Sequence, residues 1–184
     1  MNLQQCFDRH GCDRGSLRHN YHRIYEGIQP KRLLEVGVFK GAGIAAWLEY
    51  GIADITCIDL FDRIPPEAIP VLHKVKWFGG DSTTIKIQGQ FDLIIDDGAH
   101  DPISQRRTFL NLWPSCSGRY FIDDVWALDR FNKRQRAHPW IQRPEYSMAN
   151  YKKLIQALPA GFKRHDLRRG GAPDSYLFEI CRDA

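Results

Sequence analysis

The sequence has 184 residues, enough for one domain with a single sizeable core and short for two. Hydrophobic residues make up 43% of it and charged residues 26%, which excludes a disordered chain. The formal net charge of +4 permits an anionic partner but does not demand one. No apolar stretch approaches the ~20 residues of a membrane span, and the first residues lack a signal-peptide pattern. We therefore expect a cytoplasmic protein without a membrane partner.

Residues 1–30 are polar and rich in His, Arg and Tyr. They predict a helical and loop segment over the active site, with a second helix around Asn20–Gly27 that ends before Pro30. From residue 31 to residue 184, short apolar runs alternate with amphipathic stretches, which predicts one domain. The expected strands are Arg32–Val38, Asp54–Leu60, Val71–Phe78, Phe91–Asp96 and Arg119–Asp123, and the expected helices are Gly43–Tyr50, Pro102–Trp113 and Ser147–Leu158.

Two further alternating runs, Phe162–Leu167 and Ser175–Cys181, flank a Gly-Gly-Ala-Pro turn and predict a closing antiparallel pair. Strands separated by helices indicate an α/β fold, here a doubly wound, Rossmann-like, mostly parallel sheet of seven strands. In such sheets ligands bind at the carboxyl ends of the strands. The residues just after each strand are therefore the candidates for function.

The first strand runs into a glycine-rich turn, with Glu35 two residues before Gly37 and with Gly41 farther on. Glycines let the backbone approach a ligand closely, and the next helix directs free N–H groups at the same place. The spacing differs from the GxGxxG of dinucleotide-binding folds, and a carboxylate here would repel a pyrophosphate. It suits the positively charged methionyl end of S-adenosylmethionine. The alternative is an ordinary turn whose glycines serve packing.

Acids follow the next two strands as well. Asp59 ends the second strand, where it could accept both hydroxyls of a ribose. Asp81 and Ser82 follow the third strand, where they could contact the adenine of the same cofactor. A surface turn is the alternative for that Gly-Gly-Asp-Ser stretch.

The fourth strand leads into Asp96, Asp97 and, one turn later, His100, and the fifth strand ends at Asp123 and Asp124. Parallel neighbours would bring Asp97, Asp123 and Asp124 to one edge as three uncompensated carboxylates, which would raise one another's pKa. A divalent cation would remove that cost, and oxygen-only ligands favour a hard ion such as Mg²⁺. Capping of turns and helices is the alternative.

Two residues of this run have other candidate roles. Asp96 is a further candidate for cofactor contact, although the sequence does not separate it cleanly from Asp97 as a cap or metal ligand. Histidine is the usual general base near neutral pH, so His100 is the candidate catalytic base. A structural hydrogen bond made by a loop histidine is the alternative.

An insertion at 126–146 mixes aromatic and basic side chains, which can stack on sugars or bases or grip phosphate. We interpret it as a substrate lid, with an oligomer interface as the alternative. Its aromatic and basic residues are Trp126, Arg130, Phe131, Lys133, Arg134, Arg136, His138, Trp140, Arg143 and Tyr146.

These motifs together resemble metal-dependent O-methyltransferases of the macrolide-sugar type and, more distantly, catechol O-methyltransferase. The resemblance implies that Asp97, Asp123 and Asp124 bind Mg²⁺ and that His100 deprotonates the substrate hydroxyl. The chain departs from the pattern at Cys12 and Arg14, where Thr and Lys are usual. The segments that carry the resemblance are His10–Ser16 with His19 and Tyr21, then Leu34–Gly37, Ile58–Asp59, Ile95–His100 and Ile122–Asp124.

The resulting expectation is methyl transfer from S-adenosylmethionine to a hydroxyl of a small molecule, a sugar or glycoside, with homo-oligomerisation left open. A nucleic-acid methyltransferase is the first alternative, because the insertion is basic. A non-catalytic module that binds S-adenosylmethionine is the second. Five cysteines without a Cys-x-x-Cys pair are expected to be reduced thiols.

Overall fold

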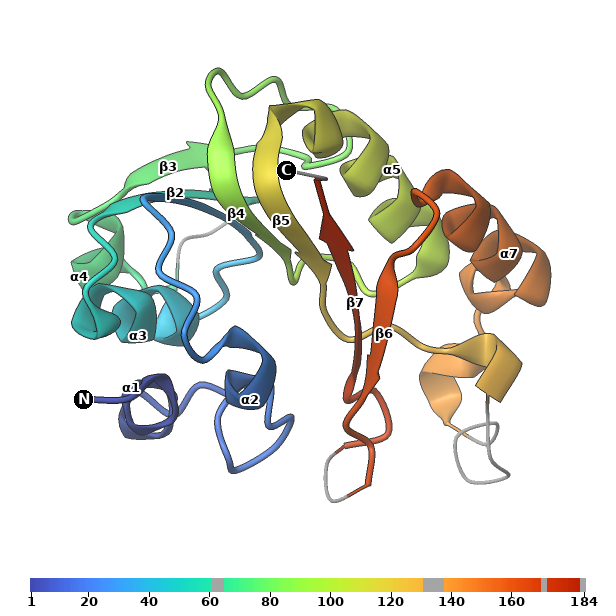
Figure 1. Ribbon diagram of the computed structural model, residues 1–184, viewed down its shortest axis with the longest axis horizontal. Coiled ribbons are helices and arrows are strands. Elements are labelled where there is room, and N and C mark those ends of the chain that lie inside the picture. The colour runs from blue at the N-terminus through green and yellow to red at the C-terminus, as the bar shows by residue number, and fades with distance from the viewer. Residues whose placement is uncertain (61–64, 131–137, 170–171, 183–184) are drawn as a thin grey trace.

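The computed structural model describes residues 1–60, 65–130, 138–169 and 172–182. Within these ranges seven strands form one sheet, in the order β3-β2-β1-β4-β5-β7-β6 (Figure 1). β7 runs antiparallel to β5 and to β6, and the other neighbours are parallel. The strands are β1 (Arg32–Val36), β2 (Asp54–Asp59), β3 (Lys76–Gly79), β4 (Phe91–Asp96), β5 (Cys116–Ile122), β6 (Lys163–Asp166) and β7 (Tyr176–Cys181).

Helices cover both faces of the sheet (Figure 1). The helices from the first half of the chain pack on one face and the two later ones on the other. The first group is α1 (Leu3–Arg9), α2 (His22–Tyr25), α3 (Ala42–Tyr50) and α4 (Ile69–Leu72), and the second is α5 (Pro102–Leu112) and α7 (Met148–Ala157). Short 3₁₀ turns lie at Trp113–Ser115, Leu128–Arg130, Pro139–Gln142 and Pro144–Tyr146.

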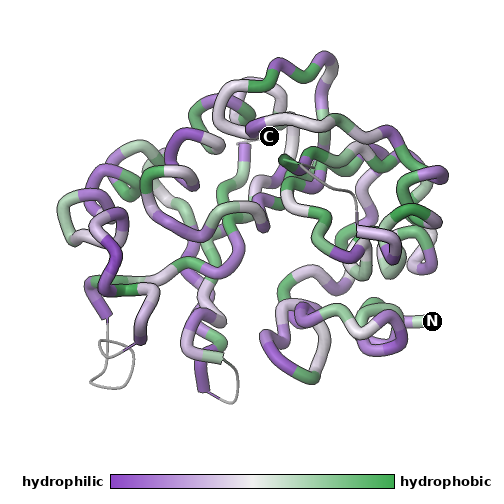
Figure 2. The backbone as a smooth tube through the Cα atoms, turned by 180° about the vertical axis from the view of Figure 1, so that it is seen from behind, coloured by the Kyte–Doolittle hydropathy of each residue, from purple (hydrophilic) through white to green (hydrophobic). Residues whose placement is uncertain are grey.

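The central strands are apolar on both faces because each face is covered. Successive side chains point to opposite faces, so adjacent residues belong to different cores. On β1, Leu33 packs with the α1–α4 side and Leu34 with the α5–α7 side. Seen from behind, the chain alternates between hydrophobic and hydrophilic stretches (Figure 2). No helix in the described ranges has the length and apolar character needed to cross a bilayer.

Residues 1–30 share the core of the sheet. Phe7 on α1 and Tyr25 on α2 are fully buried, and they lie in the same cluster as Leu33 and Phe121 of the sheet. An Asn2 capping box starts α1. The segment therefore docks as part of the domain and brings its side chains to the ends of β1, β4 and β5.

Most expected elements are confirmed, but several boundaries were wrong: β1 ends two residues early, at Val36, and the largest errors are the starts of two other strands. Val71 and Leu72 belong to α4 rather than to the third strand, and β3 begins at Lys76. Leu72 is buried in the α1–α4 core, so a buried helical turn, and not a strand, explains this apolar stretch. β5 begins three residues earlier than expected, at Cys116, directly after a 3₁₀ turn. All five cysteines are free thiols, as predicted.

Candidate active site

The glycine loop, residues 37–43, links β1 to α3. Gly37 has φ +88°, and a Cβ there would lie 2.1 Å from the carbonyl oxygen of Asp97. Gly41 has φ +82° at the start of α3, where a Cβ would lie 2.6 Å from the Val71 side chain. Without side chains at these positions, the loop backbone lies close against the turn after β4 at Gly37 and against α4 at Gly41. These two predicted cofactor residues line one large cleft.

Asp59, at the end of β2, holds this loop in place. One of its carboxylate oxygens accepts N–H groups of Val38, at 2.7 Å, and Phe39, at 3.2 Å, and the other accepts the N–H of Leu60. Asp59 also lines the cleft. It therefore orders the loop and keeps acceptor capacity for the predicted ribose contact. Phe39, with φ +47° and 76% of its side chain exposed, stands beside it at the rim.

Asp81 and Ser82 line the same cleft after β3, as predicted for an adenine contact. The Asp81 carboxylate accepts the Thr83 N–H at 2.8 Å, and this hydrogen bond lowers the pKa of Asp81. The Ser82 hydroxyl is paired with Thr108 of α5 at 2.9 Å. Asp81 thus stabilises the turn itself, which was the alternative interpretation, and Ser82 connects the turn to α5.

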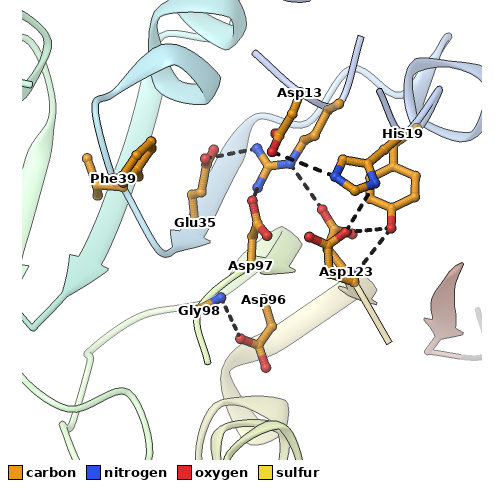
Figure 3. A network of polar contacts seen from close by, with 12 residues as sticks. Asp13, His19, Glu35, Phe39, Asp96, Asp97, Gly98 and Asp123 are labelled. Carbon is orange, nitrogen blue, oxygen red and sulfur yellow. Dashed lines mark hydrogen bonds and ion pairs between the residues drawn. The ribbon is translucent and has the colours of Figure 1, made fainter. Parts of the chain in front are cut away.

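Arg14 is the largest departure from expectation. Its buried guanidinium contacts three carboxylates, each on a different strand end (Figure 3). Nη1 donates to Glu35 at 2.9 Å, Nη2 to Asp97 at 2.7 Å and Nε to Asp123 at 3.0 Å. The sequence-based premise of uncompensated acids was therefore wrong. The compensating cation comes from a segment 83 and 109 residues away from Asp97 and Asp123, which no local motif reveals.

The backbone explains why these acids meet. Glu35 follows Leu34 on β1, so it points to the opposite face, toward α1 and α3. A Cβ at Gly43 would lie 2.6 Å from the Glu35 carboxylate and 2.7 Å from the Arg14 guanidinium, so that glycine makes room for the pair. Burial raises the pKa of Glu35 although Arg14 opposes it. Its Oε2 is buried without a hydrogen-bond partner among the described residues.

Asp123 and Asp124 are adjacent but differently surrounded. Asp123 is fully buried, and its second oxygen accepts the Tyr25 hydroxyl in a short hydrogen bond. Asp124, in a left-handed backbone conformation with φ +51°, accepts the Tyr21 hydroxyl at 2.7 Å and lines the cleft. Burial raises the pKa of Asp123 to about 7 and that of Asp124 well above its usual value.

Asp96 lies elsewhere. The alternation along β4 turns its side chain to the face that α5 covers, where it is 98% buried, and it does not line the cleft (Figure 3). One oxygen accepts the Gly98 N–H at 3.4 Å, and burial raises the pKa of this carboxyl well above its usual value. The predicted cofactor contact thus has no support from this position.

His100 follows the turn after β4 and is half-buried. Its Nδ1 is buried without a hydrogen-bond partner in the described part of the chain. Ligand atoms of Asp97, His100 and Asp124 all lie within 4.8 Å of one another. The geometry therefore gathers two of the three predicted metal ligands with the predicted base, whereas Asp123 lies outside this group.

Two hollows meet at His100. The large cleft, about 1360 Å³, runs from the glycine loop past Asp97 and Asp124, and a second pocket of about 710 Å³ lies beside the insertion. Trp140 borders both hollows, 42% exposed, with its ring centre 6.5 Å from that of His100.

Part of the insertion can be described. Trp126 and Tyr146, expected to stack on substrate, are largely buried in the α5–α7 core, although each also reaches the wall of one hollow. Trp140 and Arg143 border the smaller pocket. The expectations for Phe131, Lys133, Arg134 and Arg136 fall outside the described residues.

Reasoning from sequence missed the polar contacts of the N-terminal segment. Arg14, Tyr21 and Tyr25 all contact the acids after β4 and β5. Arg14 did stand out, as a cation at a position where the resembling family has lysine. That signal marked a basic position without showing which acids it would meet.

The chain is similar to known methyltransferases. No family model matches the chain. The 8-demethyl-8-(2-methoxy-alpha-L-rhamnosyl)-tetracenomycin-C 3'-O-methyltransferase of Streptomyces olivaceus is 28% identical, over 65% of this chain and 35% of its own length. The chain thus spans about a third of that relative.

Solved structures agree. MycE, a methyltransferase from the mycinamycin biosynthetic pathway solved with Mg, SAH and mycinamycin VI, matches 98% of this chain and 54% of its own, with TM-score 0.64 and 21% identity. A candidate O-methyltransferase of Nostoc punctiforme PCC 73102 matches 98% and 60%, with TM-score 0.63 and 11% identity. The chain therefore has the Rossmann-like methyltransferase fold, and its predicted resemblance to class I O-methyltransferases is confirmed.

Proposed function

We propose that the chain is an S-adenosylmethionine-dependent O-methyltransferase that uses a divalent cation and methylates a hydroxyl of a small molecule. One observation carries the proposal: the cleft of the glycine loop and the pocket of the insertion meet at His100, beside Asp97 and Asp124. A methyl donor and an acceptor bound in these two hollows would meet at a base and a candidate cation site.

The cleft fits the cofactor. Gly37 and Gly41 leave its floor free of side chains, and Glu35 has a buried carboxylate oxygen without a partner among the described residues. Such an oxygen can accept a hydrogen bond from an ammonium group, and its cost of burial would then be offset. Asp59, at the end of β2, would bind the ribose. S-adenosylmethionine would supply the methyl group and leave as neutral S-adenosylhomocysteine.

The acid edge, which we define as Asp97, Asp123 and Asp124, fits a divalent cation. Within the described residues, the carboxylates of Asp97 and Asp124 each keep one oxygen that accepts no hydrogen bond. Two carboxylates with water ligands suit Mg²⁺ or Mn²⁺. A bound cation would orient the acceptor hydroxyl and lower its pKa.

His100 would remove the proton. Its ring stands between the two hollows, and neutral imidazole accepts a proton on its unprotonated nitrogen. The proton would leave from the ring to solvent through the open side of the pocket. Glu35, Asp59 and the glycine loop would hold the donor in line with the acceptor oxygen, since alignment supplies much of the rate in such transfers.

A sugar or glycoside is the acceptor class we propose. Trp140 offers a partly exposed ring with the Arg143 guanidinium over it, 5.1 Å from the ring centre, and Asp101 and Glu145 border the same pocket. An aromatic face with polar groups at its edge suits a sugar ring, which has apolar C–H faces and hydroxyl edges. The tetracenomycin enzyme acts on a rhamnosyl group, and MycE was solved with mycinamycin VI, which supports this class.

The test has two parts. Calorimetry with S-adenosylhomocysteine should show micromolar binding, with NAD⁺ as the negative control. Mass spectrometry should then show a gain of one methyl group on a rhamnosyl or macrolide-glycoside acceptor with Mg²⁺, and none with EDTA. Binding of NAD⁺ alone would overturn the cofactor assignment. Unchanged turnover after chelation would refute the proposed metal requirement. Methylation of RNA or DNA alone would favour the nucleic-acid alternative.

A further inference from the structure

Arg14 is not used by the reaction described above, yet it is among the most deeply buried charged side chains of the described chain. Its three nitrogens each contact a different acid, on the ends of β1, β4 and β5. A guanidinium presents its N–H groups in a rigid planar fork, whereas a lysine has one nitrogen. Arg14 can therefore fix three carboxylates at once.

The two acids after β5, Asp123 and Asp124, differ in whether they contact Arg14. Both oxygens of Asp123 are occupied, one by Arg14 and one by the Tyr25 hydroxyl, and the side chain is fully buried outside the cleft wall. Asp124, the next residue, lines the cleft. A carboxylate oxygen of Asp124, a carboxylate oxygen of Asp97 and a ring nitrogen of His100 all lie within 4.8 Å of one another. Two carboxylates one position apart thus face different partners.

We propose that Arg14 is a positioning residue that holds Asp123 as its structural counter-ion, so that Asp97 and Asp124 bind the divalent cation and Asp123 does not. This inference rests on the metal of the proposed function. It departs from the ligand set that the family resemblance implies, which includes Asp123.

Charge supports this division. Asp97 is shared, because one of its oxygens accepts Arg14 at 2.7 Å and the other stays free to coordinate. A cation bound to Asp123 would have to share its oxygens with Arg14 and Tyr25, and displacing either contact would leave a buried donor unpaired, which is costly. Binding to Asp97 and Asp124 displaces neither contact of Asp123.

The experiment uses the full chain and Mn²⁺ as the probe, with free Mn²⁺ measured by electron paramagnetic resonance. Asp123→Asn and Asp124→Asn are matched variants, one residue apart. We expect Asp124→Asn to weaken Mn²⁺ binding by at least about tenfold. Asp123→Asn should leave Mn²⁺ affinity within about threefold and lower the melting temperature in EDTA by roughly 6–20 °C, as for a broken buried ion pair.

The inference is overturned if Asp123→Asn loses Mn²⁺ affinity as strongly as Asp124→Asn, or if Asp124→Asn keeps it. Should Asp123→Asn fail to fold, Tyr25→Phe replaces it, because it removes one hydrogen bond from Asp123 and keeps the ring. This variant should lower the melting temperature in EDTA and keep Mn²⁺ affinity within about threefold, and a tenfold loss would count against the inference. A wild-type chain that binds no Mn²⁺ refutes the metal of the proposed function itself, and the ligand assignment with it.

Discussion

The glycine loop and the acid edge are neighbouring parts of one site but are held by different kinds of contact. The loop is fixed by backbone groups and by Asp59, about 20 positions further along the chain. The acid edge is fixed by side chains of the N-terminal segment, 83 to 109 positions away. The hydrogen bonds that fix the loop are therefore short-range in sequence, whereas those of the edge require residues 10–25 to dock.

Substitutions in the two regions should therefore have different effects. Changes at the edge should act on catalysis, metal binding and docking of the N-terminal segment. Changes at the loop should act on its backbone and on cofactor binding. Each prediction below tests one side of that comparison, in order of decreasing expected effect.

His100→Ala should have the largest effect. A positioned general base contributes about 10²–10⁴-fold in rate, so turnover on a glycoside acceptor should fall by that range. Because His100 lies at the junction of the two hollows rather than beside the glycine loop, S-adenosylhomocysteine affinity by calorimetry should stay nearly constant. A variant that keeps most of its turnover would show that this histidine is structural.

Arg14→Met should destabilise the fold by about 3–5 kcal/mol, because it leaves buried carboxylates without their cation. That is a large part of the ~5–15 kcal/mol that stabilises a typical domain. Urea unfolding at pH 7 measures it. Arg14→Lys, which keeps the charge with a single nitrogen, should lose less. Equal urea midpoints for wild type and Arg14→Met would show that the edge does not depend on this contact.

The contrast also explains what could be predicted from sequence. Strands such as Phe91–Asp96 are apolar runs that bury both faces, so the sequence pattern predicted the strands. The acids directly after the strand ends were found in the same way. The pattern could not say which face Asp96 takes, because both faces of this strand are apolar and alternation alone does not identify the face that carries the site. In the structure it faces α5, away from the cleft.

The acid edge was harder for a different reason. Its acids were found, but their partners were not, since Arg14, Tyr21 and Tyr25 reach them only through tertiary packing. Orientation of Asp123 depends on these partners rather than on its own neighbours. Sequence therefore predicted which residues gather at the edge, and the structure was needed to divide them.

On the loop side, Gly37→Ala should destabilise the chain by about 2–4 kcal/mol, because the new methyl group would overlap the Asp97 carbonyl as well as force a positive φ. Gly27→Ala is the control, since Gly27 has φ +83° with no atom within 4 Å of a Cβ. It should cost only about 1–2 kcal/mol from the backbone. If urea unfolding gives equal losses, the close approach of loop and turn is not what the glycine serves.

The smallest effect is expected at Asp13, one residue before Arg14 but half-exposed. Its contact with His19, 3.7 Å between Oδ2 and Nε2, lowers the pKa of Asp13 to about 2. A carboxylate whose pKa is lowered by folding stabilises the native state above its unfolded pKa, about 3.9, and loses that contribution as pH falls toward 2. Because 49% of the side chain is exposed, solvent screening limits the contribution to less than about 1 kcal/mol.

Asp13→Asn should therefore be slightly less stable than wild type at pH 6, and the two urea midpoints should converge between pH 4 and pH 2. A difference that stays constant with pH would mean that Asp13 acts through packing or hydrogen bonding and not through its charge.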